Sequence, residues 1–344
     1  MEGDADRPDG SGLRVAVIGA GIAGLACARA LEQAGARVVV YEKGRGVGGR
    51  LASRTTPWGG FDHGAQYFTV QTSAFDPVVA GWAAGGVIAP WQGRLVALSS
   101  GRTIESTLTT QRFVGQPGMQ ALPDHLARGL DVRLLVPIER LSRTAAGWRL
   151  IDTAGGAVGL STFDAVCLAV PSPQAAQLLR GISPLAERCA AVAWEPCWAT
   201  LVALGQPCEA GFDGAFVNDD PILGWIARDS TKPARPRTDG VAERWVLHAR
   251  PRWSREYLEM PEDEVAHWML RAFGARLGGA LIQPRAIALS WPCATPINPL
   301  AQACLWDPHQ RVGAAGDWCG GPRVEGAWLS GLALAAAVTA AVMA

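Results

Sequence analysis

The stretch that decides the fold runs from Arg14 to Glu42 and reads RVAVIGAGIAGLACARALEQAGARVVVYE. Four of its first five residues are apolar and three of these are β-branched, which predicts a buried parallel strand. A glycine loop follows at 19–24, and the next ten residues have helical composition before Gly35 ends the helix. A second apolar strand at 37–41 ends in the acid Glu42. This order predicts one βαβ unit that binds a dinucleotide.

Each glycine of the loop has its own physical reason. Gly19 permits the tight turn, Gly21 lets the backbone approach a pyrophosphate, and Gly24 lets helix and strand pack closely. Amide N–H groups at the helix N-terminus would meet the phosphates. Glu42 would accept hydrogen bonds from the ribose hydroxyls.

A second glycine loop, GRGVGGR at residues 44–50, follows directly. A plain NAD dehydrogenase does not need it. Flavoproteins that resemble glutathione reductase and the amine oxidases carry such a stretch against the FAD diphosphate. Close backbone approach is again the reason, and Arg50 would add a cation directed at the phosphates.

The third motif closes the chain. An apolar strand ends in Gly316-Asp317, and a helix is expected to start near residues 324–327. Asp317 would bond a ribityl hydroxyl of FAD. Amides near Glu325–Ala327 would face the flavin ring at the helix N-terminus, where the partial positive charge stabilises an anionic reduced flavin. The three motifs together predict FAD as the cofactor.

Composition bounds the alternatives. The chain has 344 residues and equal numbers (31 each) of basic and acidic side chains, which argues against a nucleic-acid-binding protein. Hydrophobic residues make up 49% of the chain, so a large core and about two domains are expected. Only two of the basic residues are lysines, Lys43 and Lys232.

Spacing and termini give further expectations. The eight cysteines are scattered without a C-x-x-C pair and the histidines lack ligand spacing, which predicts reduced thiols, no metal site and a cytoplasmic protein. Residues 1–13 read as a disordered tail without a signal peptide. Residues 326–344 carry no charge and are long enough to span a bilayer, but their alanine-rich composition favours a buried helix and no membrane partner.

The fold class expected is α/β, with a Rossmann-like FAD-binding domain and an inserted α+β substrate domain. The FAD-binding domain is assigned residues 14–70, 117–170 and 291–344. The substrate domain is assigned residues 71–116 and 171–290, where alternating runs at 198–204 and 244–249 suggest an antiparallel sheet. The charged, proline-containing segment Asp229–Arg244 reads as a surface loop or lid.

Longer signatures resemble one family. FDHGAQYFT (61–69), YEKGRGVGGR (41–50), WSREY (253–257) and GDWCGGPRVEGAWLSG (316–331) look like the bacterial renalases, flavoproteins once grouped with the amine oxidases. The resemblance runs from Arg14 to the C-terminus and is looser over 171–290, where ARDSTKP (227–233) carries it.

The resemblance implies a p-hydroxybenzoate-hydroxylase-like fold with non-covalent FAD. It also implies an oxidase that returns the 1,2- and 1,6-dihydro isomers of NAD(P)H to NAD(P)+ by hydride transfer to flavin N5, with dioxygen reduced to hydrogen peroxide. The motifs place the FAD contacts on Gly19, Ala20, Gly21, Gly24, Glu42, Lys43, Gly49, Arg50, Gly64, Ala65, Gln66, Val136, Asp317, Glu325 and Ala327.

Hydride transfer from a dihydropyridine needs positioning more than acid–base help. The candidate substrate-pocket residues are Trp225, His248, Arg250 and Trp291. A core or surface role explains each of them as well, and it also explains His63 inside the 61–69 signature.

Two alternatives stay open. A flavin amine oxidase or a desaturase is the first, although many amine oxidases place a lysine near flavin N5. Lys43 lies by the expected adenosine ribose and Lys232 in the charged loop, so that arrangement requires Lys232 to fold inward. Arginine cannot replace it as a base. The second alternative is a non-catalytic FAD-binding redox module. The sequence does not indicate the oligomeric state.

Overall fold

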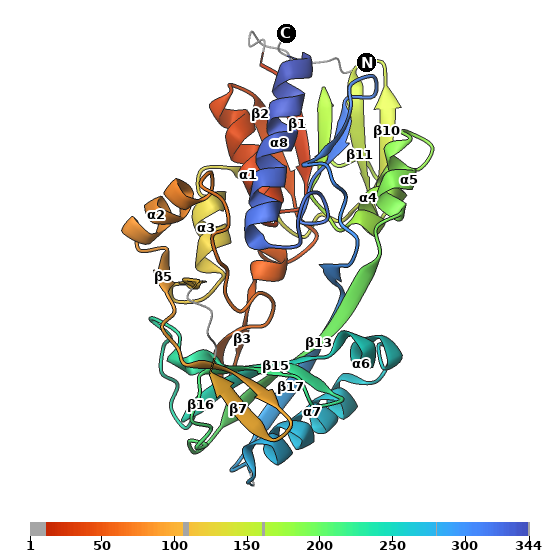
Figure 1. Ribbon diagram of the computed structural model, residues 1–344. Coiled ribbons are helices and arrows are strands. Elements are labelled where there is room, and N and C mark those ends of the chain that lie inside the picture. Colours follow the sequence, from red (N-terminus) through yellow and green to blue (C-terminus); the bar gives the residue numbers. More distant parts are fainter. Residues whose placement is uncertain (1–11, 106–109, 160–161, 280, 343–344) are drawn as a thin grey trace. The chain divides into compact units, whose positions relative to one another are not determined.

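The computed structural model describes residues 12–105, 110–159, 162–279 and 281–342 (Figure 1). Residues 1–11 of the expected disordered tail lie outside this range. The chain forms two compact units. Unit 1 comprises Met1–Gly49, Pro123–Ala193 and Asn298–Ala344, and unit 2 comprises Arg50–Leu122 and Trp194–Ile297.

Unit 1 is built on a six-stranded sheet in the order β18-β19-β12-β1-β2-β9. Its strands are β1 (Arg14–Ile18), β2 (Arg37–Tyr41), β9 (Asp131–Arg133), β12 (Ala165–Leu168), β18 (Leu305–Asp307) and β19 (Val312–Ala314). All neighbours are parallel except β18 and β19. Ile18 pairs with Tyr41 and with Leu168, so the carboxyl ends of these three strands meet at one edge. The predicted βαβ unit and Rossmann-like fold are confirmed.

Helices and a hairpin complete unit 1. They are α1 (Ile22–Gln33), α4 (Ser172–Leu179), α5 (Leu185–Ala190), α8 (Val324–Val342) and the hairpin β10 (Ile138–Thr144) with β11 (Gly147–Asp152). Residues 134–137 separate β9 from β10. Leu135 between them has a φ of 60°, a left-handed conformation that interrupts a strand.

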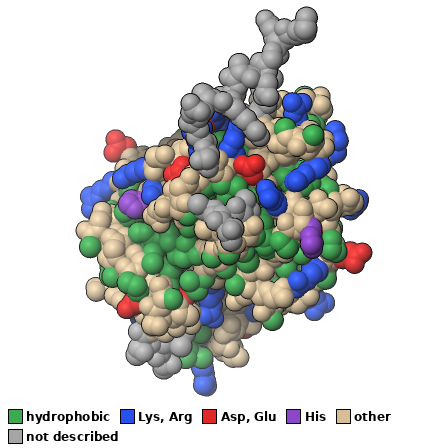
Figure 2. Space-filling model, turned by 90° about the horizontal axis from the view of Figure 1, so that it is seen from above, with side chains coloured by type: hydrophobic (Ala, Val, Ile, Leu, Met, Phe, Trp, Pro, Cys, Tyr) green, Lys and Arg blue, Asp and Glu red, His purple; other side chains and the backbone are tan. Residues whose placement is uncertain are grey.

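Helix α8 lies beside α1 (Figure 1). A Cβ at Gly331 would sit 2.1 Å from the Ala23 carbonyl oxygen, so the two helices approach closely only because this residue is glycine. The part Val324–Ala341 is long and apolar enough to cross a membrane by length and composition alone. On the face shown in Figure 2, hydrophobic side chains gather toward the middle, and Lys and Arg side chains are scattered toward the edges.

Unit 2 is built on a seven-stranded sheet in the order β17-β13-β16-β15-β14-β6-β7. Its strands are β6 (Leu95–Ser99), β7 (Arg102–Glu105), β13 (Trp194–Leu204), β14 (Gly214–Val217), β15 (Leu223–Arg228), β16 (Glu243–Ala249) and β17 (Arg285–Pro296). The two alternating runs at 198–204 and 244–249 pair antiparallel as predicted, and only β6 and β14 pair in parallel.

The two faces of this sheet differ. Helices α6 (Pro251–Glu256) and α7 (Glu262–Leu277) cover one face (Figure 1), and their apolar side chains pack with Trp198, Trp245 and Leu247. The hairpin β3 (Ser53–Thr56) with β4 (Gly59–Asp62) packs on the other. The remaining elements are β5 (Ile88–Pro90), β8 (Phe113–Gly115), α2 (Asp76–Ala84), α3 (Ala121–Ala127) and two short 3-10 turns, η1 (Gly49–Leu51) and η2 (Asp229–Thr231).

The unit boundaries differ from the domain boundaries expected from sequence, at 70 and 170. Residues 50–70 group with unit 2 because Phe61 packs with Leu201 and Val246 of its sheet. Residues 171–193 group with unit 1, where the Ser183 hydroxyl donates a 2.6 Å hydrogen bond to Asp307.

Candidate functional site

In unit 1, the loop after β1 is shaped by two glycines that exclude a side chain. Gly19 has a φ of +102°, and a Cβ there would lie 2.5 Å from the Ala169 carbonyl oxygen. A Cβ at Gly24 would lie 1.9 Å from the Gly19 carbonyl oxygen. The clashing atoms belong to the backbone, so they could not move aside as the end of a flexible side chain could. Gly19 therefore sets the turn and Gly24 the close packing of helix on loop.

Gly21 is different because it faces open space. A Cβ there would meet no atom within 4 Å. The residue is the N-cap of α1, and no side chain caps this helix end. The first amide N–H groups of the helix are thus left for an anionic ligand, and the missing side chain lets such a ligand reach the backbone. This cradle fits the pyrophosphate of a dinucleotide.

Glu42 follows β2 at the same edge of the sheet. Its carboxylate accepts hydrogen bonds from the backbone N–H groups of Ala20 (2.9 Å) and Gly44 (2.7 Å). Two carboxylate oxygens offer about four acceptor positions, so ribose hydroxyls can still bind. The Val136 amide donates to the Glu42 carbonyl oxygen at 3.0 Å, whereas the Lys43 side chain is exposed.

The second glycine loop lies on the first. The Gly48 amide donates a 2.8 Å hydrogen bond to the Ala20 carbonyl, and a Cβ at Gly49 would lie 3.6 Å from the Gly21 Cα. The C-terminal motif adjoins the same strand ends, because the Trp318 indole donates to the Val170 carbonyl at 3.1 Å. Three of its residues, all buried, are predicted FAD contacts: Asp317, Glu325 and Ala327.

The remaining predicted FAD contacts lie in unit 2. The Ala65 amide donates to the Arg50 carbonyl at 2.9 Å, and a Cβ at Gly64 would come within 2.1 Å of that oxygen. The Arg50 guanidinium stacks 5.1 Å from the Trp194 ring and donates to the Ala294 carbonyl. Its role toward a phosphate stays a prediction.

A buried ionic cluster occupies unit 2 beside this loop. We call it the Lys232 cluster, and its members are Asp62, Gln66, Asp229, Lys232 and Arg235. The Lys232 ammonium donates to Asp229 (2.8 Å), Asp62 (3.1 Å) and the Gln66 side-chain oxygen (3.2 Å). Arg235 bonds Asp62 and lies 3.6 Å from Asp229.

The cluster corrects the expectation that Asp229–Arg244 is a surface loop only at its buried residues, since residues 236–242 are exposed or half-buried. Lys232 is only 2% exposed and folds inward, because two buried carboxylates attract it. Burial by itself would raise the pKa of Asp62, but the Lys232 and Arg235 cations lower that pKa to about 2. Two cations thus balance two anions. An ammonium has three N–H donors, and all three of those on Lys232 are engaged.

An aromatic surface covers the sheet face opposite α7. Val246, two residues before His248 on β16, packs against Phe61, which puts His248 on this face. Trp225 of β15 pairs in register with His248. The Trp291 ring lies 5.0 Å from that of His63, and Tyr67 lies 5.8 Å from Trp225. We call these five side chains the aromatic face: His63, Tyr67, Trp225, His248 and Trp291.

The backbone of His63 joins two members of this face. Its carbonyl oxygen accepts a hydrogen bond from the Trp291 indole (3.1 Å) and faces the His248 Nε2 at 3.3 Å. Burial lowers the pKa of both imidazoles to about 4, helped by the Arg54 cation at His63 and the Lys232 cation at His248. Both rings are therefore neutral at pH 7.

We expect the His63 and His248 side-chain ¹⁵N resonances to show neutral imidazoles at pH 6. Their folded pKa lies below the ordinary value of about 6.5, so only the unfolded chain binds these protons between pH 6.5 and 4. The free energy of unfolding should therefore fall as the pH is lowered from 6.5 to 4. Resonances are assigned from His63→Phe and His248→Phe, and a charged imidazole at pH 6 in either position would contradict the burial argument.

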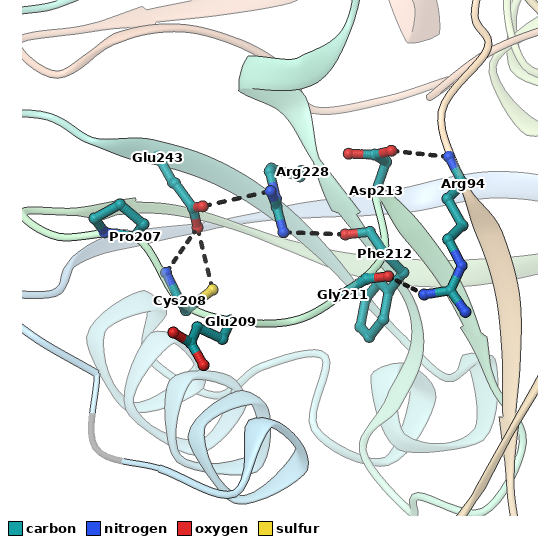
Figure 3. A pocket seen from close by; sticks show the side chains of 9 residues that line it. All are labelled: Arg94, Pro207, Cys208, Glu209, Gly211, Phe212, Asp213, Arg228 and Glu243. Carbon is teal, nitrogen blue, oxygen red and sulfur yellow. Dashed lines mark hydrogen bonds and ion pairs between the residues drawn. The ribbon is translucent and has the colours of Figure 1, made fainter.

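Arg250 does not join the aromatic face. Its guanidinium donates to the carbonyl oxygens of Asp220 (2.6 Å) and Val217 (2.8 Å), which ties it to a loop. A hollow of about 470 Å³ elsewhere in unit 2 is lined by charged side chains together with Pro207 and Phe212 (Figure 3). In it, Glu243 pairs with Arg228 at 3.5 Å and accepts from the Cys208 amide.

The sequence reading missed the carboxylates and the arginine that hold Lys232. Asp62 lies in the FDHGAQYFT signature and Asp229 in ARDSTKP, so both belong to segments already singled out in the sequence. The signal that could have revealed this pairing is that one signature carries the acid Asp62 and the other the base Lys232. Among the described residues, no group of three His, Cys, Asp or Glu side chains is placed to hold a metal ion.

Comparison with known proteins agrees with this arrangement. Residues 17–80 match the family of NAD(P)-binding Rossmann-like domains, and residues 82–201 match the flavin containing amine oxidoreductases. A putative protoporphyrinogen oxidase from Exiguobacterium sp. 255-15 superposes with a TM-score of 0.74 at 15% identity, covering 95% of this chain and 99% of that one. Cyclohexylamine oxidase from Brevibacterium oxydans IH-35A superposes with 0.71 at 15% identity, covering 97% and 100%.

Putrescine oxidase bound to putrescine is similar too, with a TM-score of 0.68 at 15% identity over 95% of this chain and 99% of that one. At such identity the structural likeness is one of fold. The two matched families, the shared fold and the open cradle at Gly21 agree on one cofactor. The chain is an amine-oxidase-like flavoprotein, an oxidoreductase whose cofactor is FAD.

Proposed function

We propose that this protein oxidises the 1,2- and 1,6-dihydro isomers of NAD(P)H to NAD(P)+ in the cytoplasm. The observation that carries the proposal is that the aromatic face has flat, neutral walls. Both its imidazoles are uncharged at pH 7, and the carboxylates behind it, Asp62 and Asp229, are neutralised by two cations. A neutral dihydropyridine ring suits such walls.

The chemistry required of the side chains is small. When bound, FAD would supply the hydride acceptor, and its reoxidation by dioxygen with one further proton would give hydrogen peroxide. The aromatic face would hold the substrate ring and exclude water. No proton has to be taken from the substrate, and the Lys232 ammonium is already engaged with three acceptors.

The second candidate is a flavin amine oxidase. The match over residues 82–201 and the inward position of Lys232 favour it. Against it stands the state of Lys232, whose ammonium has no free N–H to hold a water molecule. An amine also arrives as a cation, and the described part of the aromatic face offers it no unpaired carboxylate.

Anaerobic reduction of the bound flavin tests the proposal. We expect the 1,2- and 1,6-dihydro isomers to bleach the 450 nm flavin absorbance about 100-fold faster, or ~2.7 kcal/mol in activation free energy, than 1,4-NAD(P)H or putrescine. Stopped-flow absorbance measures the rates. Reduction by an amine but not by the isomers would establish the amine oxidase instead, and a flavin that none of them reduces would favour a non-catalytic module.

A further inference from the structure

Trp225 carries a buried hydrogen-bond donor without an acceptor. The side chain is 7% exposed, and its indole Nε1 has no hydrogen-bond partner in the described part of the chain. Leaving such a donor unpaired costs about 1–3 kcal/mol. Native proteins keep few such groups, and each calls for an explanation; at a surface that could bind a ligand, an acceptor on that ligand is one.

His248 presents the complementary group. A carbonyl oxygen only accepts, so the hydrogen bond to the His63 carbonyl requires the proton on Nε2 of the neutral ring. Nδ1 then holds a lone pair, and the hydrogen bond that this ring makes in the described part of the chain is made by Nε2, not by Nδ1. Because Trp225 and His248 are paired in register on neighbouring strands and share a face, the two side chains are neighbours on it.

We propose that Trp225 and His248 together recognise a primary carboxamide on the substrate ring. The indole N–H of Trp225 donates to the carboxamide oxygen, and Nδ1 of His248 accepts from its NH₂ group. A carboxylate would meet the His248 lone pair with a negative charge, and an acetyl group would leave that lone pair unpaired. The inference rests on the proposed function and adds a specificity determinant to it.

The test measures binding of oxidised product analogues to the FAD-loaded protein by isothermal titration. For the wild type we expect NAD+ to bind about 10-fold tighter than 3-acetylpyridine adenine dinucleotide and about 100-fold tighter than nicotinic acid adenine dinucleotide. Equal affinities for all three would overturn the inference without any variant. Reduction of the flavin by dihydro isomers would still stand, since it is read in a separate experiment.

Two variants separate the two contacts. Trp225→Phe removes the donor that carboxamide and acetyl share, so both ligands should weaken about 10-fold and their ratio stay near wild type. His248→Phe removes the acceptor that only the carboxamide uses, so NAD+ alone should weaken and the preference vanish. Phe216→Leu, whose ring lies 4.7 Å from Trp225 but cannot hydrogen-bond, is the control with unchanged affinities. An unchanged preference for NAD+ in folded, FAD-loaded His248→Phe contradicts the assignment.

Discussion

Lys232→Met is expected to lower the free energy of unfolding by about 3–5 kcal/mol, whereas Lys43→Met should change it by no more than about 0.5 kcal/mol. Removing the buried ammonium leaves two buried carboxylates with one guanidinium. Lys43 is exposed. Since these are the only lysines, each variant loses one charge from the same total and net-charge effects cancel.

Urea unfolding at pH 7, followed by circular dichroism, gives both values. A second substitution sharpens the result, because Lys232→Met combined with Asp229→Asn restores the balance of one cation and one anion. The double variant should be more stable than Lys232→Met alone. Equal midpoints for Lys232→Met and Lys43→Met would show that the Lys232 cluster contributes nothing to folding.

The predicted dinucleotide site of unit 1 could be located from sequence because the residues that form it are close together in the chain. Gly19, Gly24 and Glu42 stand within one βαβ unit, and strand, turn and helix fix their places without help from distant residues. The antiparallel pairing of residues 198–204 with 244–249 follows from alternation in the same way. Local patterns set these elements.

The Lys232 cluster could not be predicted this way. Asp62 and Lys232 are 170 residues apart, and their contact depends on the β3–β4 hairpin packing on the sheet of unit 2. A charged segment with prolines looks like a solvated loop in one sequence, because nothing local reveals buried partners. That the chain has only two lysines says nothing about whether one of them is buried, as Lys232 is. What weighs against a lysine-bound water is the saturation of its three N–H donors.

The aromatic face lies between these cases. Alternation along β15 and β16 gives each strand two faces, and the register of the strands brings Trp225 beside His248. Arg250 lies two positions after His248 in the chain, at the end of β16, where it turns to bond the carbonyls of residues 217 and 220. Sequence proximity to a site residue was therefore a poor guide once the strand had ended.

Gly21→Ala is expected to lose FAD affinity but keep its stability, whereas Gly24→Ala is expected to lose stability. At Gly21 a Cβ meets no protein atom within 4 Å, so the variant should fold with wild-type stability. The added methyl would stand in the cradle where the pyrophosphate approaches the backbone, and FAD should bind about 100-fold more weakly, which corresponds to ~2.7 kcal/mol. At Gly24 the methyl would lie 1.9 Å from the Gly19 carbonyl, so the fold itself should lose about 3 kcal/mol or more.

Gly81→Ala is the matched control, because Gly81 is exposed within α2 and a Cβ there also meets nothing within 4 Å. It should keep FAD and gain about 0.5–1 kcal/mol of stability from the better helix former. Urea midpoints of the apoproteins report folding, and quenching of FAD fluorescence on titration reports affinity. If Gly21→Ala retains wild-type FAD affinity, the open space above Gly21 does not receive the pyrophosphate. If Gly24→Ala unfolds at the wild-type midpoint, helix α1 tolerates displacement from the loop, and the close-packing role of the third glycine is wrong.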